Sequence, residues 1–373
     1  DEVMVVAYGT AKKSAFTGSA TVISNDAIEK TQVTNVLDAL SGKVAGLQLS
    51  NSSGAPGASS PTIRIRGFSS MNAGNSPLVI VDGTPYSNDI NTLNTNDIES
   101  MTVLKDAASN ALYGARGANG VILITTKRAK LGEAKVTVDA KWGVNMRATQ
   151  DYDYIKDPAQ YYETYYNSLY TFATTAPEIV TNPQTGDDEN IGGLGYDAAR
   201  AYIWANNNLT ADNAYGLGYN VYTMPAGQYL IGKNGKLNPN ATLGRIVNNK
   251  GANYFVTPDN WLDETYKHSL RQEYNVSVTQ GNDKSNFFAS VGYLKNDGII
   301  VAKSDFQRFT ARLNADVQAK PWLKVGARGS YSHIVMNAMD SEEGNSASTG
   351  NIFAAATGIA PIYPLYIRDA AGN

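Results

Sequence analysis

The segment FQRFTARLNADV, residues 306–317, alternates apolar and polar side chains along most of its length. Its apolar members are Phe309, Ala311, Leu313, Ala315 and Val317, and its polar members are Arg308, Thr310, Arg312, Asn314 and Asp316. Successive side chains of a strand point to opposite faces, so this period of two predicts a strand with one apolar and one polar face.

Four more segments follow this pattern, at 135–145, 274–279, 285–295 and 321–332. The runs are about 10–12 residues long, the length that a tilted strand needs to cross a bilayer. Short connections at Gly281–Lys284 and Gln318–Pro321 alternate with longer ones at 147–270, Asn296–Asp305 and after 334, as in outer-membrane barrels. Aromatic residues near the strand ends fit interfacial girdles or, alternatively, the edges of a soluble sheet: Trp142, Tyr293, Trp322 and Tyr331.

Composition excludes several other classes. The 373 residues include no Cys and two His, so a disulfide scaffold, a zinc ribbon, a Cys nucleophile and a His-rich metal site are not expected. A net charge of -3 gives no broad cationic surface for nucleic acid. No apolar run reaches the ~20 residues of a membrane-spanning helix, and DEVMVVAYGT at 1–10 carries no signal-peptide pattern.

Residues 20–130 have a different pattern, that of a compact mixed α/β domain. We expect strands at Leu47–Leu49, Thr62–Arg66, Leu78–Val81 and Val121–Thr126, with a turn at 82–85. Short helices are expected at 26–30 after Ser24, at 36–40 after Thr34, and at 106–112, the last ending at Gly114.

Several motifs in this order resemble one protein family. They are DEVMVVAYGTAKKS at 1–14, GKVAGLQL at 42–49, RIRGF at 64–68, PLVIVDGTP at 77–85 and VLKDAASNALYGARGANGVILITTKR at 103–128. WLDE at 261–264, YLKNDGI at 293–299 and FQRFTARLN at 306–314 extend the match. Together they resemble the plug domain and first barrel strands of SusC/RagA-type TonB-dependent outer-membrane transporters.

The resemblance implies an α+β plug domain followed by the N-terminal strands of a transmembrane antiparallel β-barrel. It divides the chain into a TonB box and linker at 1–19, a plug at 20–130, and a partial barrel at 131–373 with a long external loop at 147–270. The family barrel has 22 strands, whereas the pattern predicts five, so we expect a mature or trimmed fragment. An open sheet edge in lipid would leave backbone groups unpaired.

The resemblance also implies a function and partners. The function is TonB-dependent import of a bulky nutrient, an oligosaccharide or a peptide, across the outer membrane of a Gram-negative bacterium. The partners are TonB with its inner-membrane motor proteins, a SusD-like surface lipoprotein and outer-membrane lipid. No enzyme activity, cofactor or nucleic-acid partner is expected. Two alternatives stay open, a surface glycan-binding or adhesion protein and a glycoside hydrolase on a β scaffold.

The predicted TonB contact comprises Glu2, Val3, Met4, Val5 and Val6. An unhindered extended segment can add a strand to a partner's sheet edge, and its main-chain hydrogen bonds share a pulling force. The alternative is that these residues form the first plug strand or a tail.

The predicted gating residues stand in the strongest plug motifs: Arg64, Arg66, Gly67, Asp82, Gly83, Lys105, Asp106, Tyr113 and Gly114. Arg64, Arg66 and Asp82 suit a charged lock between plug and barrel, or an ion pair or turn cap inside the plug. The glycines suit special backbone geometry.

The predicted cargo contacts are Met71, Asn72, Asn75, Tyr86, Asn88 and Trp204. The segment 147–270 also holds 15 of the 23 tyrosines, whose flat faces suit sugar rings or peptide side chains. In the alternative, the tyrosines at 161–170 follow Asp157-Pro158 with helical spacing and pack that helix onto the barrel.

Two further segments carry patterns found in nucleotide-binding or acidic sites. Gly227–Lys233 matches a phosphate loop up to Lys233, but Asn234 follows and no buried strand precedes, which excludes nucleotide binding. The acidic runs 187–189 and 342–343 favour solvated loop charge over paired catalytic carboxylates, with loop-bound calcium as the alternative.

Overall fold

The computed structural model describes residues 3–6, 9–12, 20–51, 54–57, 61–67, 74–105, 111–129, 132–148, 153–181, 187–337 and 352–373. The chain forms two compact units, and each is described by itself. The first unit is Asp1–Arg147 with His268–Asp340, and the second is Ala148–Lys267 with Ser341–Asn373.

The N-terminal domain of the first unit contains a five-stranded sheet in the order β3-β8-β9-β6-β7, in which only the β6–β9 pair is parallel. Its strands are β3 (Ala20–Ser24), β6 (Leu78–Val81), β7 (Thr84–Pro85), β8 (Ile98–Leu104) and β9 (Val121–Thr126). Two separate pairs are β1 (Val3–Val6) with β2 (Gly9–Lys12), and β4 (Leu47–Ser50) with β5 (Thr62–Ile65). The expected strands are therefore confirmed, and Asp82 and Gly83 form the β6–β7 turn with positive φ at both residues.

The helices of this domain are short: α1 (Asn25–Glu29) and the 3-10 helices η2 (Val36–Leu40), η3 (Ile90–Thr92), η4 (Thr95–Asp97) and η5 (Ala111–Gly117). Two sequence expectations were wrong in detail. The side chain that caps η2 is Asn35, which accepts from the Leu37 amide, and not Thr34. Ser24 occupies the N-cap position of α1, but its side chain forms no capping hydrogen bond. Gly114 has the expected role, because with φ 60° it is the non-helical residue at which one short helix within η5 ends and the next begins. The helices pack on the sheet through an apolar core that includes Ile28, Leu40 and Met101.

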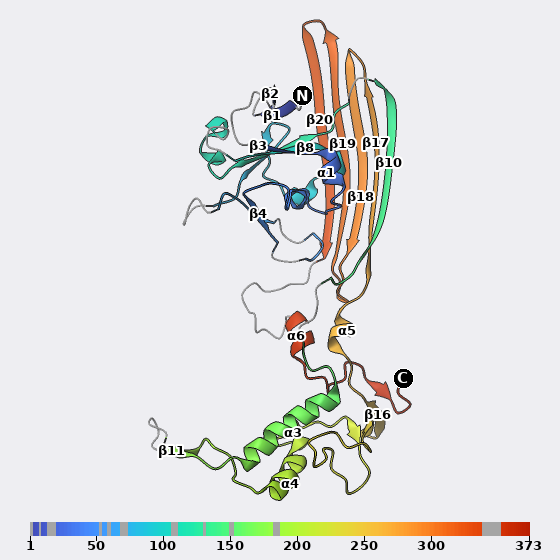
Figure 1. Cartoon of the computed structure of the whole chain (residues 1–373). Helices are drawn as coiled ribbons and strands as arrows, with labels where there is room; N and C mark the ends of the chain where they lie inside the picture. Colours follow the sequence, from blue (N-terminus) through green and yellow to red (C-terminus); the bar gives the residue numbers. More distant parts are fainter. Residues whose placement is uncertain are drawn as a thin grey trace. The chain divides into compact units, whose positions relative to one another are not determined.

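The other part of the first unit is a five-stranded antiparallel sheet, termed here the large sheet (Figure 1). Its strands in spatial order are β10 (Gly132–Asn145), β17 (Ser269–Gly281), β18 (Ser285–Asp297), β19 (Asp305–Lys320) and β20 (Leu323–Asn337). All five expected strands are present. They have 13–16 residues rather than 10–12, because the polar ends of the hairpins continue the backbone ladder.

The register of the large sheet sorts side chains into apolar and polar rows. One row across the sheet is Val138, Val276, Val291, Ala311 and Tyr331. The adjacent row on the opposite face is Asp139, Asn275, Gly292, Thr310 and Ser332. The valines are exposed, whereas Asn275 and Thr310 are buried, because the N-terminal domain lies against the polar face (Figure 1).

The second unit contains the helices α3 (Pro158–Thr174), α4 (Ala198–Leu209), α5 (Trp261–Thr265) and α6 (Ile352–Gly358). Its strands are β11 (Ile179–Thr181), β12 (Asp188–Asn190), β13 (Tyr222–Thr223), β14 (Thr242–Leu243), β15 (Arg245–Asn249), β16 (Ala252–Val256) and β21 (Arg368–Asp369). Within the described residues, no helix has the length and apolar character needed to cross a membrane.

Residues 147–270, expected as a long loop within the region 131–373, contribute most of this second unit, and the expected division itself stays a prediction. Residues 148–267 fold together with the C-terminal segment around their own core. Tyr162 and Tyr166 of α3 are buried in that core beside Leu209 of α4. Asp157 starts α3 because its side chain accepts from the Ala159 amide and Pro158 follows at the first position.

Candidate functional site

The candidate site is the polar interface between the N-terminal domain and the large sheet. Strand alternation creates the sheet side of it, because every second residue of β17, β18 and β19 faces the domain. These residues include Arg271, Glu273, Asn275, Ser290, Arg308, Thr310, Arg312 and Asn314, all largely buried. Several polar side chains are thereby enclosed between two parts of one unit.

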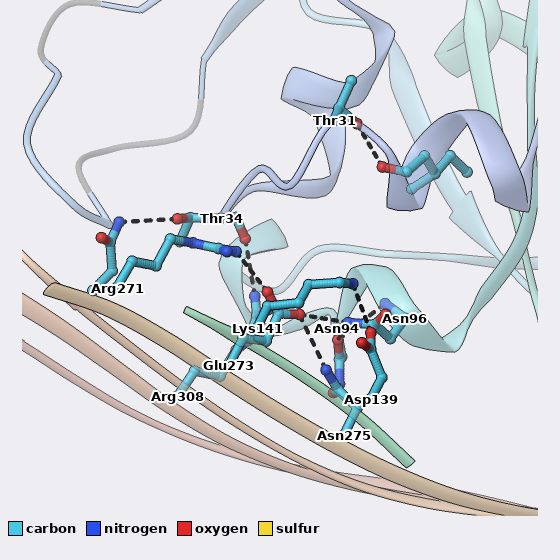
Figure 2. A network of polar contacts seen from close by, with 12 residues as sticks. Thr31, Thr34, Asn94, Asn96, Asp139, Lys141, Arg271, Glu273, Asn275 and Arg308 are labelled. Carbon is cyan, nitrogen blue, oxygen red and sulfur yellow. Dashed lines mark hydrogen bonds and ion pairs between the residues drawn. The ribbon is translucent and has the colours of Figure 1, made fainter. Parts of the chain in front are cut away.

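Arg308 is the most connected side chain of the interface and is 2% exposed. Its Nη1 donates to the backbone oxygen of Thr34 at 3.1 Å (Figure 2). The same atom donates to the backbone oxygens of Asn91 and Leu93 at 2.8 and 2.7 Å. Asn91 and Leu93 lie in and just after the short helix η3, whose carbonyls have few partners within so short a helix. The Arg308 guanidinium of the sheet therefore donates hydrogen bonds to backbone carbonyl oxygens of the N-terminal domain.

Asn94 links the local structure of the domain to the sheet. Its Oδ1 caps η4 by accepting from the Asn96 amide at 3.0 Å. Its Nδ2 donates to Asn275 Oδ1 at 2.8 Å and to Thr310 Oγ1 at 3.2 Å. Gly292 stands beside this contact, where a Cβ atom would lie 2.6 Å from Asn275 Oδ1. The absence of a side chain at Gly292 thus leaves room for the amide of Asn94.

Glu273 is a buried carboxylate with several partners. It accepts from Arg271 Nη2 at 2.6 Å, from Asn275 Nδ2 at 3.1 Å and from Asn96 Nδ2 of the domain (Figure 2). A buried charge is stable when it is paired and hydrogen-bonded. Asn96 therefore contributes to a sheet-bound ion pair and becomes part of the same network.

A second charged group lies at the ends of β6 and η4. Arg312 Nη1 is 3.8 Å from Asp82 Oδ2, and its Nε is 3.6 Å from Asp97 Oδ2. Asp97 also accepts from Ser290 Oγ at 2.6 Å. Burial raises the pKa of the Asp97 carboxyl above its usual value, and the Ser290 hydrogen bond and the Arg312 charge only partly oppose this. Docking of Asp97 thus has a desolvation cost.

The structure places one predicted gating residue, Asp82, at this interface. Its carboxylate also accepts from the Thr126 amide and hydroxyl at 3.0 and 2.6 Å, so it serves the domain and the sheet together. Arg64 lies on β5 opposite Gln48 of β4. The backbone amide of Arg66, at φ 60°, donates to the Gly46 oxygen. The lock proposed for both arginines stays a prediction.

The remaining gating residues hold the domain's own conformation. Gly67 and Gly83 have φ of 95° and 87°, which suits glycine. Lys105 Nζ donates to the Ala45 oxygen at 3.1 Å. Tyr113, just before the kink at Gly114, packs against the small apolar cluster around Val121. Asp106 lies outside the described residues.

The predicted cargo and TonB contacts are dispersed. Tyr86 and Asn88 line a cavity of about 180 Å³ between the domain and β19–β20, which Arg312 also lines. Asn75 is half-buried just before β6. Trp204 packs in the second unit against Phe172 and Tyr215 with ring centroids 5.9 and 5.3 Å away. Val3, Met4, Val5 and Val6 form β1, paired with β2, while Glu2, Met71 and Asn72 lie outside the described residues.

Sequence reasoning missed most of the interface. Arg308 and Arg312 appeared only as polar members of the segment 306–317, and Glu273, Asn94 and Asp97 were not singled out. Part of the signal was present in that segment, since two arginines on one face of a strand require either buried partners or solvent. Which of the two applies depends on what covers that face.

The geometry suits reversible docking better than covalent chemistry. Polar groups that hydrogen-bond across the interface can be rehydrated on separation, so the net stabilisation per bond is only about 0.5–1.5 kcal/mol. Among the described residues, no three His, Asp or Glu side chains lie close enough together to hold a metal ion. Asp188 of β12 accepts from Thr181 Oγ1, and Glu342 and Glu343 are outside the described residues, so loop-bound calcium stays a prediction.

Comparisons with known proteins agree with this architecture. Residues 12–121 match the family model described as TonB-dependent Receptor Plug Domain. The TonB-dependent receptor SusC of Bacteroides thetaiotaomicron is 30% identical over 99% of this chain and 29% of its own length. The TonB-dependent receptor P26 of Formosa agariphila is 28% identical over 100% of this chain and 30% of its own length.

Solved structures give the same result. The RagAB peptide importer in its open-open state matches with a TM-score of 0.66 and 25% identity, over 100% of this chain and 36% of that chain. The chain therefore spans about a third or less of the length of these relatives. The five-stranded large sheet accordingly corresponds to part of a barrel.

Proposed function

We propose that this chain, which is of the SusC/RagA type of TonB-dependent receptors and belongs to the outer membrane of a Gram-negative bacterium, supplies the gate of an energy-coupled nutrient importer. The N-terminal domain is the plug. In the resting state it occludes the barrel, and it is displaced when TonB pulls on its leading segment. The cargo is a bulky nutrient, an oligosaccharide or a peptide.

The observation that carries the proposal is the chemistry of the interface. Within the described residues, most of the buried side chains that the large sheet turns toward the plug are polar and hydrogen-bond to it, and Phe288, Leu294 and Phe306 are the buried apolar members of this face. An interface of this kind fixes the closed position largely by directional bonds. Separation then exposes groups that water solvates well, which suits a gate that opens repeatedly.

The N-terminal segment is the proposed attachment point for TonB. β1 (Val3–Val6) is extended and pairs antiparallel with the short strand β2. A partner's sheet edge can take the place of β2 or extend the pair, with main-chain hydrogen bonds that resist a pull along the strand. TonB is the proposed partner at this edge, energised by its inner-membrane motor proteins. A SusD-like surface lipoprotein is the proposed partner on the outer side.

Deletion of residues 3–6 in the complete receptor tests the proposal. Energy-dependent uptake of cargo should fall to the level of a TonB-deficient strain, while cargo binding to whole cells stays unchanged. A variant with Val5→Cys should form a disulfide with a cysteine-bearing TonB during uptake. Uptake that survives the deletion contradicts the proposal and favours a surface-binding protein, whereas turnover of an oligosaccharide by the purified receptor favours the hydrolase.

A further inference from the structure

The second unit contains a cavity of about 650 Å³ that none of the predicted site residues lines. It lies between α3, the first turns of α4 and the segment from Tyr229 to Gly235. This volume is within the range of small-molecule binding sites, about 300–1,000 Å³. All of its lining residues belong to the second unit.

Tyrosine rings in fixed orientations form the walls. Tyr166 and Tyr170, one helical turn apart on α3, are stacked with centroids 6.0 Å apart and planes at 27°. Tyr202 of α4 is edge-on to Tyr229 at 5.5 Å, and its hydroxyl donates to the Ile231 oxygen at 3.2 Å. Rings held in this way lose little conformational freedom when a ligand binds.

Small residues keep the cavity open. Ala198 and Ala199 begin α4 where larger side chains would enter the space. Gly235 has φ 72°, and a Cβ atom there would lie 3.2 Å from Asn167 Oδ1. The backbone conformation of Gly235 and the closeness of Asn167 both disfavour a side chain at this position.

The cavity also contains polar groups without partners. Tyr166 lines the cavity, and its hydroxyl forms no hydrogen bond with any described residue. Burial, followed by the neighbouring Tyr202 and Tyr170, raises the pKa of Tyr166 to about 12, so the hydroxyl stays protonated at neutral pH. In the described part of the chain the Asn167 amide is likewise unpaired, and Lys233 has no carboxylate partner. The Tyr166 hydroxyl, the Asn167 amide and the Lys233 ammonium group are therefore free to form hydrogen bonds with a ligand in the cavity.

We infer that this cavity binds an acidic oligosaccharide, with a sugar ring against the tyrosines and a uronate carboxylate at Lys233. The lining contains hydroxyls, amides and one ammonium group and no carboxylate, which favours a polyhydroxylated anion. Flat rings match the C–H faces of pyranoses. The sides of two helices and a turn offer no free strand edge, so the main chain of an extended peptide has no ladder to join.

This inference is independent of TonB and of the gate, because binding requires neither. It can be tested on the complete receptor purified in detergent, by isothermal titration calorimetry. The probes are trigalacturonic acid, the neutral trisaccharide maltotriose and the acidic peptide triglutamate. Failure of the proposed transport function would leave the calorimetric result unchanged.

Trigalacturonic acid should bind about tenfold more tightly than maltotriose, the factor expected for one charge-assisted hydrogen bond. Lys233→Gln should remove that difference, and Lys233→Arg should restore most of it. Tyr170→Ala should weaken both sugars by about fivefold, the factor of a lost ring contact. The matched control is Lys250→Gln, which removes the same charge from the same unit at the β15–β16 turn, outside the cavity.

Three results overturn the inference. The first is binding of trigalacturonic acid no tighter than that of maltotriose. The second is an equal loss with Lys233→Gln and Lys250→Gln, which would indicate a general charge effect. The third is binding of triglutamate as tight as that of trigalacturonic acid and equally dependent on Lys233, which would assign the cavity to acidic peptides. Tyr166→Phe removes one hydroxyl without a change of shape, so it should weaken sugar binding while the unit stays folded.

Discussion

The plug-sheet interface and the interior of the second unit are both buried, but they are built from different chemistry. The interface joins Arg308, Glu273 and Asn94 to partners across the gap by hydrogen bonds. The interior of the second unit packs Tyr162 and Leu209 with their apolar surfaces together, and the Tyr162 hydroxyl donates to the Tyr219 oxygen at 2.9 Å.

The difference separates a contact whose hydrogen bonds water can replace from a fold that apolar burial holds together. Apolar burial contributes about 25 cal/mol per Å² and is lost entirely on separation. A hydrogen bond lost on separation is mostly replaced by water, unless only one partner is removed and the other stays buried. Mutations should therefore destabilise the two regions by different routes, and each should leave the other region unchanged.

The largest effect is expected for Tyr162→Ala. Tyr162 is fully buried, so the truncation should lower the free energy of unfolding of the second unit by about 3–5 kcal/mol through lost burial and a cavity. Tyr162→Phe should cost only about 1 kcal/mol, the value of one hydrogen bond. Hydrogen exchange of α3 and α4 amides in the complete receptor measures this. Ion conductance of the receptor in a planar bilayer should stay at the wild-type level, and a conducting Tyr162→Ala receptor would remove the contrast between the regions.

Arg308→Ala should loosen plug docking by about 3 kcal/mol, because three backbone oxygens of the plug lose their buried donor. Conductance through the barrel should rise while exchange in the second unit stays unchanged. Arg308→Lys is the control, since it keeps the charge but cannot reproduce the guanidinium geometry, and its conductance should be intermediate. A closed Arg308→Ala receptor would show that the hydrogen bonds of Arg308 do not hold the plug.

Gly292→Ala adds one methyl group to the sheet face under Asn94. The Cβ atom would lie 2.6 Å from Asn275 Oδ1 and 2.8 Å from Thr310 Oγ1, so Asn94 has to withdraw at a cost of about 1–3 kcal/mol. Faster proteolysis of the plug in the folded receptor is the readout. Gly329→Ala on β20, where a Cβ atom would meet nothing within 4 Å, is the control and should have no effect.

The smallest effect concerns pH and Asp259 in the second unit. Burial raises its pKa, but hydrogen bonds from Arg368 and from the Leu365 and Tyr366 amides outweigh burial and hold the pKa below its usual value. Because the pKa of Asp259 is lower in the folded protein than in the unfolded chain, ionised Asp259 stabilises the fold. This stabilisation is fully present at pH values above the pKa of the unfolded chain, and it is lost as the pH falls through the pKa of the folded protein. Exchange of the Leu365 and Tyr366 amides, after correction for intrinsic rates, should show reduced protection only below about pH 4. Asp259→Asn should reduce the protection of these amides already at neutral pH, and acidification should cause no further loss of protection. If protection in this variant still falls on acidification, the titrating group is not Asp259.

Prediction from sequence succeeded where structure is local. Alternation in 306–317 identified β19 and its two faces, and the Asp82-Gly83 pair identified the β6–β7 turn. It was less accurate where two neighbours compete, as for Thr34 and Asn35, since either side chain can cap a helix and only the backbone path selects one. For the tyrosines at 161–170 it gave the helix and its buried face but not the packing partner, because helical spacing does not show what covers that face.

The sequence by itself determined the plug motifs, the five strands, their apolar and polar faces and the resemblance to TonB-dependent receptors, because these depend on spacing between near neighbours. Only the tertiary structure decided that Arg308 meets the carbonyl groups of Thr34, Asn91 and Leu93, that Gly292 makes room for Asn94, and that residues 148–267 enclose a tyrosine-lined cavity. These contacts join residues far apart in the chain. Their partners are set by how surfaces pack together, which no local pattern records.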